Sequence, residues 1–141
     1  MAAIADKTGL VTFPGLMMDV PLTIGAILTH VVRNHPKSEL VSRDGDAIVR
    51  LTYGEFGERC AQLAGALRRL GVRPGDRVGS FAWNTHRHLE LYFGVPGCGA
   101  VLHTANIRLF PEQVAYVVEH ADDKVVFLDG NLVPAMRKAI A

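Results

Sequence analysis

Apolar residues recur along two stretches of the chain with the spacing of amphipathic helices. Over residues 24–32 they stand at i, i+3, i+4, i+7 and i+8, and Thr23 in front of them can cap the helix. Over residues 56–70 they form a second stripe of the same kind. Thr52-Tyr53-Gly54-Glu55 before it has the form of a capping box, and Gly71 stands where a left-handed C-terminal cap is expected. Both stretches are therefore predicted to be helices docked on a core.

The second half of the chain alternates short apolar runs with helical patterns. The runs span residues 78–83, 100–104 and 125–128. This β-α-β-α-β order predicts a parallel sheet with helices on both faces. Upstream, residues 40–51 predict a β-hairpin, because Gly45 at their centre supplies the positive φ of a tight turn. The predicted fold class is α/β, a partial parallel sheet with flanking helices, preceded by an N-terminal arm, a helix and a β-hairpin.

The first part of the chain has a different character. Residues 1–21 hold apolar side chains among glycines and prolines, without a helical or alternating period. We expect an extended apolar arm that covers either its own domain or a neighbouring subunit. Residues 22–141 are expected to form the folded unit. Its last helical stretch, 132–141, has no cap and no stop signal, which predicts that the chain is truncated.

Composition and charge exclude several classes of protein. The 141 residues are 49% hydrophobic and 21% charged, which is typical of one globular unit. A formal net charge of +1 gives no support for nucleic-acid or anionic-membrane binding. No apolar run is long enough for a transmembrane segment, and no export signal precedes the arm. The two cysteines, Cys60 and Cys98, cannot make a disulfide framework, so a cytoplasmic location is expected.

The common catalytic and cofactor motifs are missing from the sequence. It contains no phosphate-binding P-loop, no dinucleotide-binding glycine fingerprint and no serine-hydrolase elbow. Ser80 lies inside an apolar run and is interpreted as a packing residue rather than a nucleophile. His86 and His88 are two residues apart and would point to different sides of a helix, so they do not form a zinc set. No catalytic, cofactor-binding or metal-binding residue is therefore assigned.

Polar residues follow the first two apolar runs of the predicted sheet. In open parallel sheets, ligands gather at the carboxyl ends of the strands. The candidate residues of a substrate cleft at these ends are Asn84, His103, Thr104, Asn106 and Arg108. Asn84 and Thr104 are equally well explained as cap and turn residues, and both interpretations remain open at this point.

Three segments of the sequence form recognisable motifs, namely Leu51-Thr52-Tyr53-Gly54-Glu55-Phe56, residues 70–78 and residues 84–109. Together they resemble the N-terminal part of medium- and long-chain fatty-acyl-CoA synthetases, which belong to the adenylate-forming, AMP-binding ligase superfamily. The first segment is similar to the first core motif of that family, the second follows it in the same order, and the third resembles the second core motif. Each segment is a weak signal by itself, whereas together they are specific. The resemblance departs at Pro96, where the family usually has an aliphatic residue and where proline should kink a helix.

The resemblance implies a function for the protein from which this chain derives. A fatty acid would attack the α-phosphate of ATP, with magnesium, to give an acyl-adenylate and pyrophosphate. The thiol of coenzyme A would then displace AMP. The family's phosphate loop, nucleotide motifs and catalytic lysine lie downstream of the matching segments, so residues 22–141 would be the first portion of the large AMP-binding domain and inactive alone. The resemblance also implies homodimer contacts through the arm.

Two other functions remain open from the sequence. The chain could be a standalone interaction or oligomerisation module that keeps a ligase-like fold without its chemistry. A small nucleotide-binding domain of flavodoxin-like design is less well supported. Self-association is also expected, because an unfinished sheet exposes unpaired strand edges and uncovered helix faces.

Overall fold

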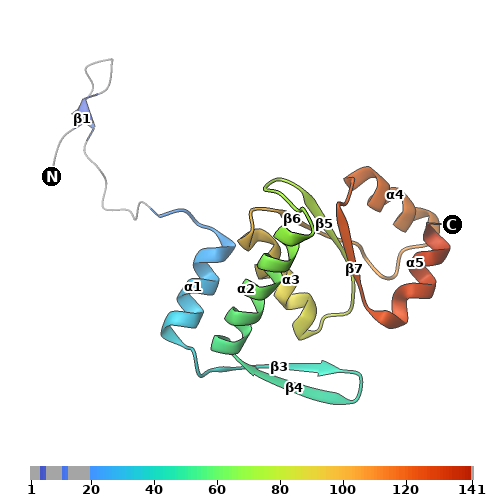
Figure 1. Cartoon of the computed structure of the whole chain (residues 1–141), viewed down its shortest axis with the longest axis horizontal. Helices are drawn as coiled ribbons and strands as arrows, with labels where there is room; N and C mark the ends of the chain where they lie inside the picture. The colour runs from blue at the N-terminus through green and yellow to red at the C-terminus, as the bar shows by residue number, and fades with distance from the viewer. Residues whose placement is uncertain (1–3, 6–10, 13–19, 141) are drawn as a thin grey trace.

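The computed structural model describes residues 4–5, 11–12 and 20–140. Helices and strands alternate through the second half of the chain as the apolar pattern predicts (Figure 1). In chain order the elements are β1 (Ile4–Ala5), β2 (Val11–Thr12), α1 (Ile24–Asn34), β3 (Glu39–Asp44), β4 (Ala47–Thr52), α2 (Tyr53–Arg69), β5 (Arg77–Phe81), α3 (His86–Gly97), β6 (Val101–Thr104), α4 (Pro111–Ala121), β7 (Val125–Leu128), the 3-10 helix η1 (Gly130–Leu132) and α5 (Val133–Ala139).

A three-stranded parallel sheet with the order β6-β5-β7 forms the centre of the fold. Helices α2 and α3 lie on one side of the sheet, and α4 and α5 lie on the other (Figure 1). The β3–β4 hairpin pairs separately, and α1 packs against α2 and α3. The predicted α/β class, with a parallel sheet and helices on both faces, is therefore confirmed.

Strand β5 is buried on both of its faces over residues 78–81, whereas its first residue, Arg77, is half-buried. Val78 lies in one core with residues of α2 and α3, and Phe81 lies in a second core with Val114 of α4 and Met136 of α5. Side chains of neighbouring strand residues point to opposite faces, so this strand supplies both cores. The nearly unbroken apolar run of residues 78–83 thus identified the most deeply buried strand among the described residues.

Local signals also place the ends of α2. The Thr52 hydroxyl accepts a hydrogen bond from the backbone N–H of Glu55 at 3.2 Å, and the Glu55 carboxylate accepts one from the Thr52 N–H at 2.8 Å. This reciprocal capping box lowers the pKa of Glu55, because two hydrogen bonds stabilise its charged carboxylate. The larger effect comes from the Thr52 backbone N–H and the smaller one from the Thr52 hydroxyl. At the other end Gly71 has φ of 85°, the left-handed conformation expected for a C-terminal cap.

The expected kink at Pro96 is not found within a helix. Pro96 lies in the last turn of α3, and the helix ends one residue later, at Gly97, so the proline accompanies an end of the helix rather than a bend within it.

The predicted arm is described only in part. Within it, β1 and β2 pair antiparallel with Ile4 opposite Thr12. The remaining apolar residues of the arm, including Phe13, Leu16, Met17 and Met18, lie outside the described residues, so the arm stays a prediction.

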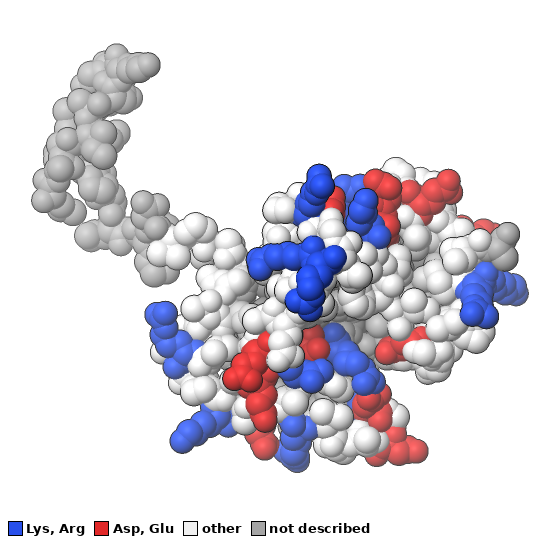
Figure 2. All heavy atoms as spheres, viewed as in Figure 1, with Lys and Arg blue, Asp and Glu red and all other residues white. Residues whose placement is uncertain are grey.

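Charges of both signs share the visible surface. Lys and Arg side chains alternate with Asp and Glu over the face seen in Figure 2. Several of them pair, including Arg77 with Asp122 at 2.9 Å and Arg50 with Glu39 at 2.7 Å. Among the described residues, no helix has both the length and the apolar character needed to cross a membrane.

Candidate functional site

The parallel strands bring the candidate residues to one edge of the sheet. Ser80 of β5 is in register with Thr104 of β6, and Phe81 of β5 is in register with Leu128 of β7. The three strands therefore end at the same edge, and the segments that follow them meet there. The sequence Trp83-Asn84 follows β5, and residues 105–108 follow β6.

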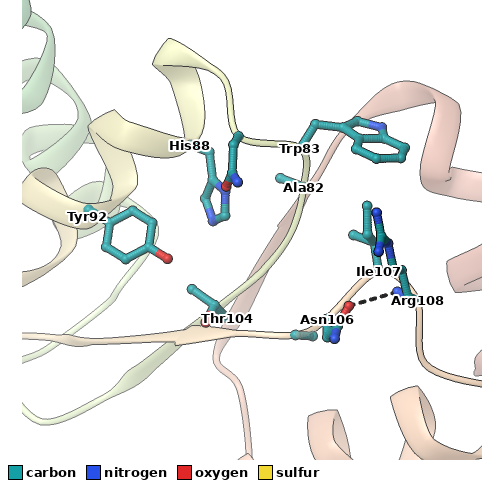
Figure 3. A pocket seen from close by; sticks show the side chains of 10 residues that line it. Ala82, Trp83, His88, Tyr92, Thr104, Asn106, Ile107 and Arg108 are labelled. Carbon is teal, nitrogen blue, oxygen red and sulfur yellow. Dashed lines mark hydrogen bonds between the residues drawn. The ribbon is translucent and has the colours of Figure 1, made fainter.

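A cavity of about 450 Å³ opens at this edge between the two strand-end segments and α3. Figure 3 shows His88 and Tyr92 projecting from α3 toward Thr104, with Trp83 and Arg108 at the opposite end. Its lining is made of Ala82, Trp83, Asn84, His88, Tyr92, Thr104, Ala105, Asn106, Ile107 and Arg108. Four of the five candidates from the sequence are therefore brought together around one cavity, namely Asn84, Thr104, Asn106 and Arg108.

His103 is the candidate that does not line this cavity. It precedes Thr104 in β6, so its side chain leaves the opposite face of the strand. Its Nδ1 lies 2.8 Å from Oδ2 of Asp123, whose side chain is fully buried. Gly79 is opposite His103 in the sheet, and a Cβ there would stand 2.7 Å from the same carboxylate oxygen. His103 thus ties β6 to the loop between α4 and β7.

The loop after β6 has a polar turn of its own. The side-chain oxygen of Asn106 accepts a hydrogen bond from the backbone N–H of Arg108 at 2.9 Å (Figure 3). This is the turn-forming role that asparagine often has. The Asn84 side chain makes no hydrogen bond with the described residues, and Thr85 rather than Asn84 is the N-cap residue of α3. Asn84 is therefore available to a ligand, whereas Asn106 is partly committed to the turn.

His88 stands against the sheet at the wall of the cavity. Its Nε2 lies 3.0 Å from the hydroxyl of Ser80, and both residues are buried. Burial lowers the pKa of His88, although the neighbouring Trp83 backbone and the charge of Asp129 act in the opposite direction. The ring is therefore neutral at pH 7. Ser80, interpreted from the sequence as a packing residue, is also the partner that orients this imidazole.

Trp83 connects the ends of two strands. Its backbone N–H donates to the carboxylate of Asp129 at 2.7 Å, and its indole N–H donates to Asn131 at 3.2 Å. Asp129 and Asn131 follow β7, so these bonds fix the β5 end against the β7 end. The indole of Trp83, a residue that is 45% exposed, is thereby held at the mouth of the cavity.

The side chains of the cavity can bind polar and anionic groups. The lining offers amides, hydroxyls, a neutral imidazole and the guanidinium of Arg108, which forms no ion pair with the described residues. It contains no carboxylate that could act as a general base or hold a metal ion. In the described part of the chain, no three metal-ligating side chains cluster together.

Three of the unpredicted lining residues have aromatic or imidazole side chains, namely Trp83, His88 and Tyr92. His88 and Tyr92 are four residues apart in a helix, and their rings lie 5.2 Å apart. This i, i+4 spacing was a usable signal, because it places both side chains on one helix face. Trp83 lies directly after an apolar run, and its link to the β7 end depends on a contact 46 residues away, which no local pattern reveals.

The chain is similar to enzymes that form CoA thioesters. The family model described as AMP-binding enzyme matches residues 28–141. A long-chain-fatty-acid–CoA ligase from Thermus thermophilus is 48% identical over 123 residues, which cover 86% of this chain and 23% of that protein. A 3-methylmercaptopropionyl-CoA ligase from Ruegeria lacuscaerulensis is 44% identical over 121 residues, which cover 85% of this chain and 22% of that protein.

The fold is also similar to that of a solved structure. A Mycobacterium tuberculosis fatty acyl CoA synthetase aligns with a TM-score of 0.73 and 26% sequence identity, over 82% of this chain and 23% of that chain. In each of these comparisons the chain spans less than a quarter of the length of the protein that it matches.

Proposed function

The chain belongs to the AMP-binding enzyme family, and we propose that it forms the N-terminal part of an ATP-dependent fatty-acyl-CoA synthetase. Its similarity to CoA ligases supports the reaction class, and the small share of those ligases that it spans supports a larger protein. Such an enzyme converts a fatty acid, ATP and coenzyme A into acyl-CoA, AMP and pyrophosphate through an acyl-adenylate. Family membership also favours this function over a flavodoxin-like nucleotide-binding domain.

The cavity at the strand ends supports a substrate-binding role for this chain within the proposed enzyme. We infer that Asn84, Thr104, Asn106 and Arg108 form one wall of the substrate cleft, with His88 behind them. Parallel α/β sheets bind ligands at this edge, and the lining combines neutral polar groups with one cation. This wall would bind and orient a substrate, while the groups that react would come from other parts of the enzyme.

The residues of the cavity fit some of the implied substrates better than others. Amides, hydroxyls and a guanidinium suit the polar or anionic groups of a nucleotide, of coenzyme A or of a carboxylate. Magnesium requires oxygen ligands, usually including carboxylates, and this lining has no carboxylate. We therefore assign no magnesium ligand and no catalytic step to these residues.

Further properties of the parent enzyme follow as proposals. Residues 1–21 would form an arm and residues 22–141 the first portion of the AMP-binding domain.

An apolar cavity of about 400 Å³ beside α1, with Leu22 almost fully exposed, supports a contact with a second copy and hence a homodimer. Free, buried Cys60 and Cys98 support a cytoplasmic location. The exposed surface beside α1 also favours the second candidate function, an interaction module.

Asn84 offers the sharpest test of the cleft wall, because it has no hydrogen bond within the described protein to lose. In the ligase that contains this chain, Asn84→Ala should raise KM for at least one of the three substrates about tenfold, as expected for a lost hydrogen bond to a charged or polar group. Asn34→Ala is the matched control, because Asn34 bonds only to His30 within α1. Unchanged KM values for fatty acid, ATP and coenzyme A in Asn84→Ala would contradict the proposed wall.

A further inference from the structure

Exposed arginines gather at the C-terminal end of α2. Arg68 and Arg69 belong to the last turn of this helix, and Arg73 follows in the turn that leads to β5. All three are exposed, and none of them forms an ion pair with another described residue. Figure 2 shows Lys and Arg side chains gathered over this end of the helix. Arg68, Arg69 and Arg73 form the basic patch of the chain.

The surrounding sequence leaves the basic patch without acidic partners. Residues 61–67, the two helical turns before it, contain no carboxylate. Asp76 lies in the turn after it, but this carboxylate is partly buried and accepts a hydrogen bond from the Arg73 backbone N–H at 2.8 Å. Asp122 is paired with Arg77 at 2.9 Å. The net charge of +1 for the whole chain therefore conceals a local excess of positive charge.

Helix stability explains only part of the basic patch. Arg68 and Arg69 suit the negative end of the α2 dipole, as basic residues in a last turn commonly do. Arg73 lies beyond Gly71, whose φ of 85° follows the end of the helix, and the effect of the dipole falls off within the last turn. A positive charge at Arg73 therefore has no role in capping α2.

Exposed aliphatic side chains accompany the arginines. Leu70 is 61% exposed, and Val101, at the start of β6, is 52% exposed. Val101 lies beside the turn that carries Arg73, because its backbone N–H donates to the carbonyl of Asp76 at 2.8 Å. Residues 61–77 contain no aromatic side chain on which a nucleic-acid base could stack. Cations around exposed aliphatic groups are typical of a surface that contacts an anionic bilayer.

The basic patch lies at the edge of the sheet opposite the proposed cleft wall. Arg73 precedes β5, whereas Trp83 and Asn84 follow it. The two edges are separated by the five-residue length of β5. A partner that contacts the basic patch therefore leaves the cleft wall open.

We propose that the basic patch binds the surface of an anionic phospholipid bilayer. The guanidinium groups bind lipid phosphates, which their planar arrays of donors match in geometry. Leu70 enters the headgroup region beside them. This contact needs neither ATP nor coenzyme A and does not involve the cleft wall, so its test is independent of the proposed ligase function.

The test is co-sedimentation of the 141-residue chain with two kinds of vesicle, phosphatidylcholine alone and phosphatidylcholine mixed equally with phosphatidylglycerol. We expect binding to the mixed vesicles alone, and added sodium chloride should weaken it, because salt screens exposed charges. The emission of Trp83, at the opposite edge, should not change on binding. Equal binding to both kinds of vesicle, no binding to either, or a shift of the Trp83 emission would each overturn the proposal.

Soluble phosphates separate a bilayer from other sources of the same chemistry. Glycerol phosphate at the phosphate concentration of the vesicles should not release the chain, because isolated phosphates lack the dense charge of a surface. Poly(U) RNA at that phosphate concentration should bind more weakly than the mixed vesicles, because the patch has no stacking side chain. Release by glycerol phosphate, or tighter binding of poly(U), would overturn the assignment of a bilayer.

Matched charge variants separate the basic patch from the charge of the whole chain. The patch variant carries Arg68→Gln, Arg69→Gln and Arg73→Gln. The control variant removes the same charge from exposed sites on α1 and α5, with Arg33→Gln, Arg137→Gln and Lys138→Gln. The patch variant should bind the mixed vesicles about a hundredfold more weakly, since each basic residue near such a surface contributes about fivefold. Circular dichroism confirms the fold of both variants, and an equal loss in both would overturn the proposal.

A leucine pair tests the aliphatic part of the contact. Leu70→Ser should weaken binding to the mixed vesicles about fivefold, because less apolar surface leaves water. Leu22→Ser is the control, because Leu22 is 98% exposed and lies before α1. The same affinity in Leu70→Ser and in the unsubstituted chain would overturn the assignment of Leu70.

Discussion

The hydroxyl of Ser80 and the Nε2 atom of His88 lie 3.0 Å apart and join the central strand of the sheet to α3. Ser80 is 1% exposed and His88 is 7% exposed, so neither group reaches bulk water. The Ser80 hydroxyl has no other partner among the described residues, and which of the two groups donates is set by the ring nitrogen that carries the proton.

Burial of His88 makes the stability of the protein depend on pH. In the unfolded chain His88 gains its proton near the ordinary pKa of 6.5, whereas burial holds the pKa of the folded state lower. Below pH 6.5 the unfolded state binds more protons, so the free energy of unfolding should fall as the pH decreases toward the folded pKa. Above that window His88 is neutral in both states and contributes no slope. Urea unfolding at a series of pH values measures this dependence.

Two histidine variants test whether His88 causes this dependence of the unfolding free energy on pH. His88→Gln should show a flatter dependence of unfolding free energy on pH between neutrality and pH 5 than the unsubstituted chain. His120→Gln should keep the original slope, because His120 is exposed and stacks only on Tyr116. Identical slopes in His88→Gln and in the unsubstituted chain would show that His88 is not held neutral by the fold.

The bond between Asp129 and Trp83 should control the mobility of the indole at the mouth of the first cavity. The sequence contains one tryptophan, so its fluorescence reports this site directly. Asp129→Ala removes the acceptor of the Trp83 backbone N–H and should cost about 1–3 kcal/mol of stability, with a shift of the emission to longer wavelength. Asp46→Ala, at an exposed contact of 3.7 Å, should change neither quantity. Unaltered emission in Asp129→Ala would argue against the proposed link between the strand ends.

The close approach of α2 and α3 depends on Gly94. A Cβ at this position would stand 2.7 Å from a Leu63 methyl group and 3.2 Å from the carbonyl oxygen of Cys60. Gly94→Ala should therefore destabilise the protein by about 1–3 kcal/mol through overpacking. Gly97→Ala is the matched control in the same helix, since nothing lies within 4 Å of its Cβ position, and alanine there should be neutral or slightly stabilising. If chemical unfolding shows that Gly97→Ala is less stable than Gly94→Ala, this packing argument is wrong.

The sequence was informative wherever local chemistry decides the structure. The capping box of Thr52 and Glu55, the left-handed glycines Gly45 and Gly71, and the fully buried strand β5 all follow from short-range pattern. The strand-end rule also indicated Asn84, Thr104, Asn106 and Arg108, which line one cavity. These features depend on residues at most a few positions apart or on the general geometry of parallel sheets.

Long-range contacts account for what the sequence did not reveal. His103 follows the same strand-end rule as Thr104, but strand alternation and buried Asp123, twenty residues away, turn it to the other face. Ser80 acquires its hydrogen-bonding role only because α3 returns across the sheet and presents His88.

The proposal that this chain supplies one part of a larger ligase is tested most directly by measuring acyl-CoA formation. Purified 141-residue chain, supplied with a fatty acid, ATP, magnesium and coenzyme A, should produce no acyl-CoA above the background without protein. A full-length ligase that contains this chain should produce acyl-CoA and AMP under the same conditions. Sustained acyl-CoA formation by the 141-residue chain alone would contradict the proposal that it supplies a wall of the cleft and not the reacting groups.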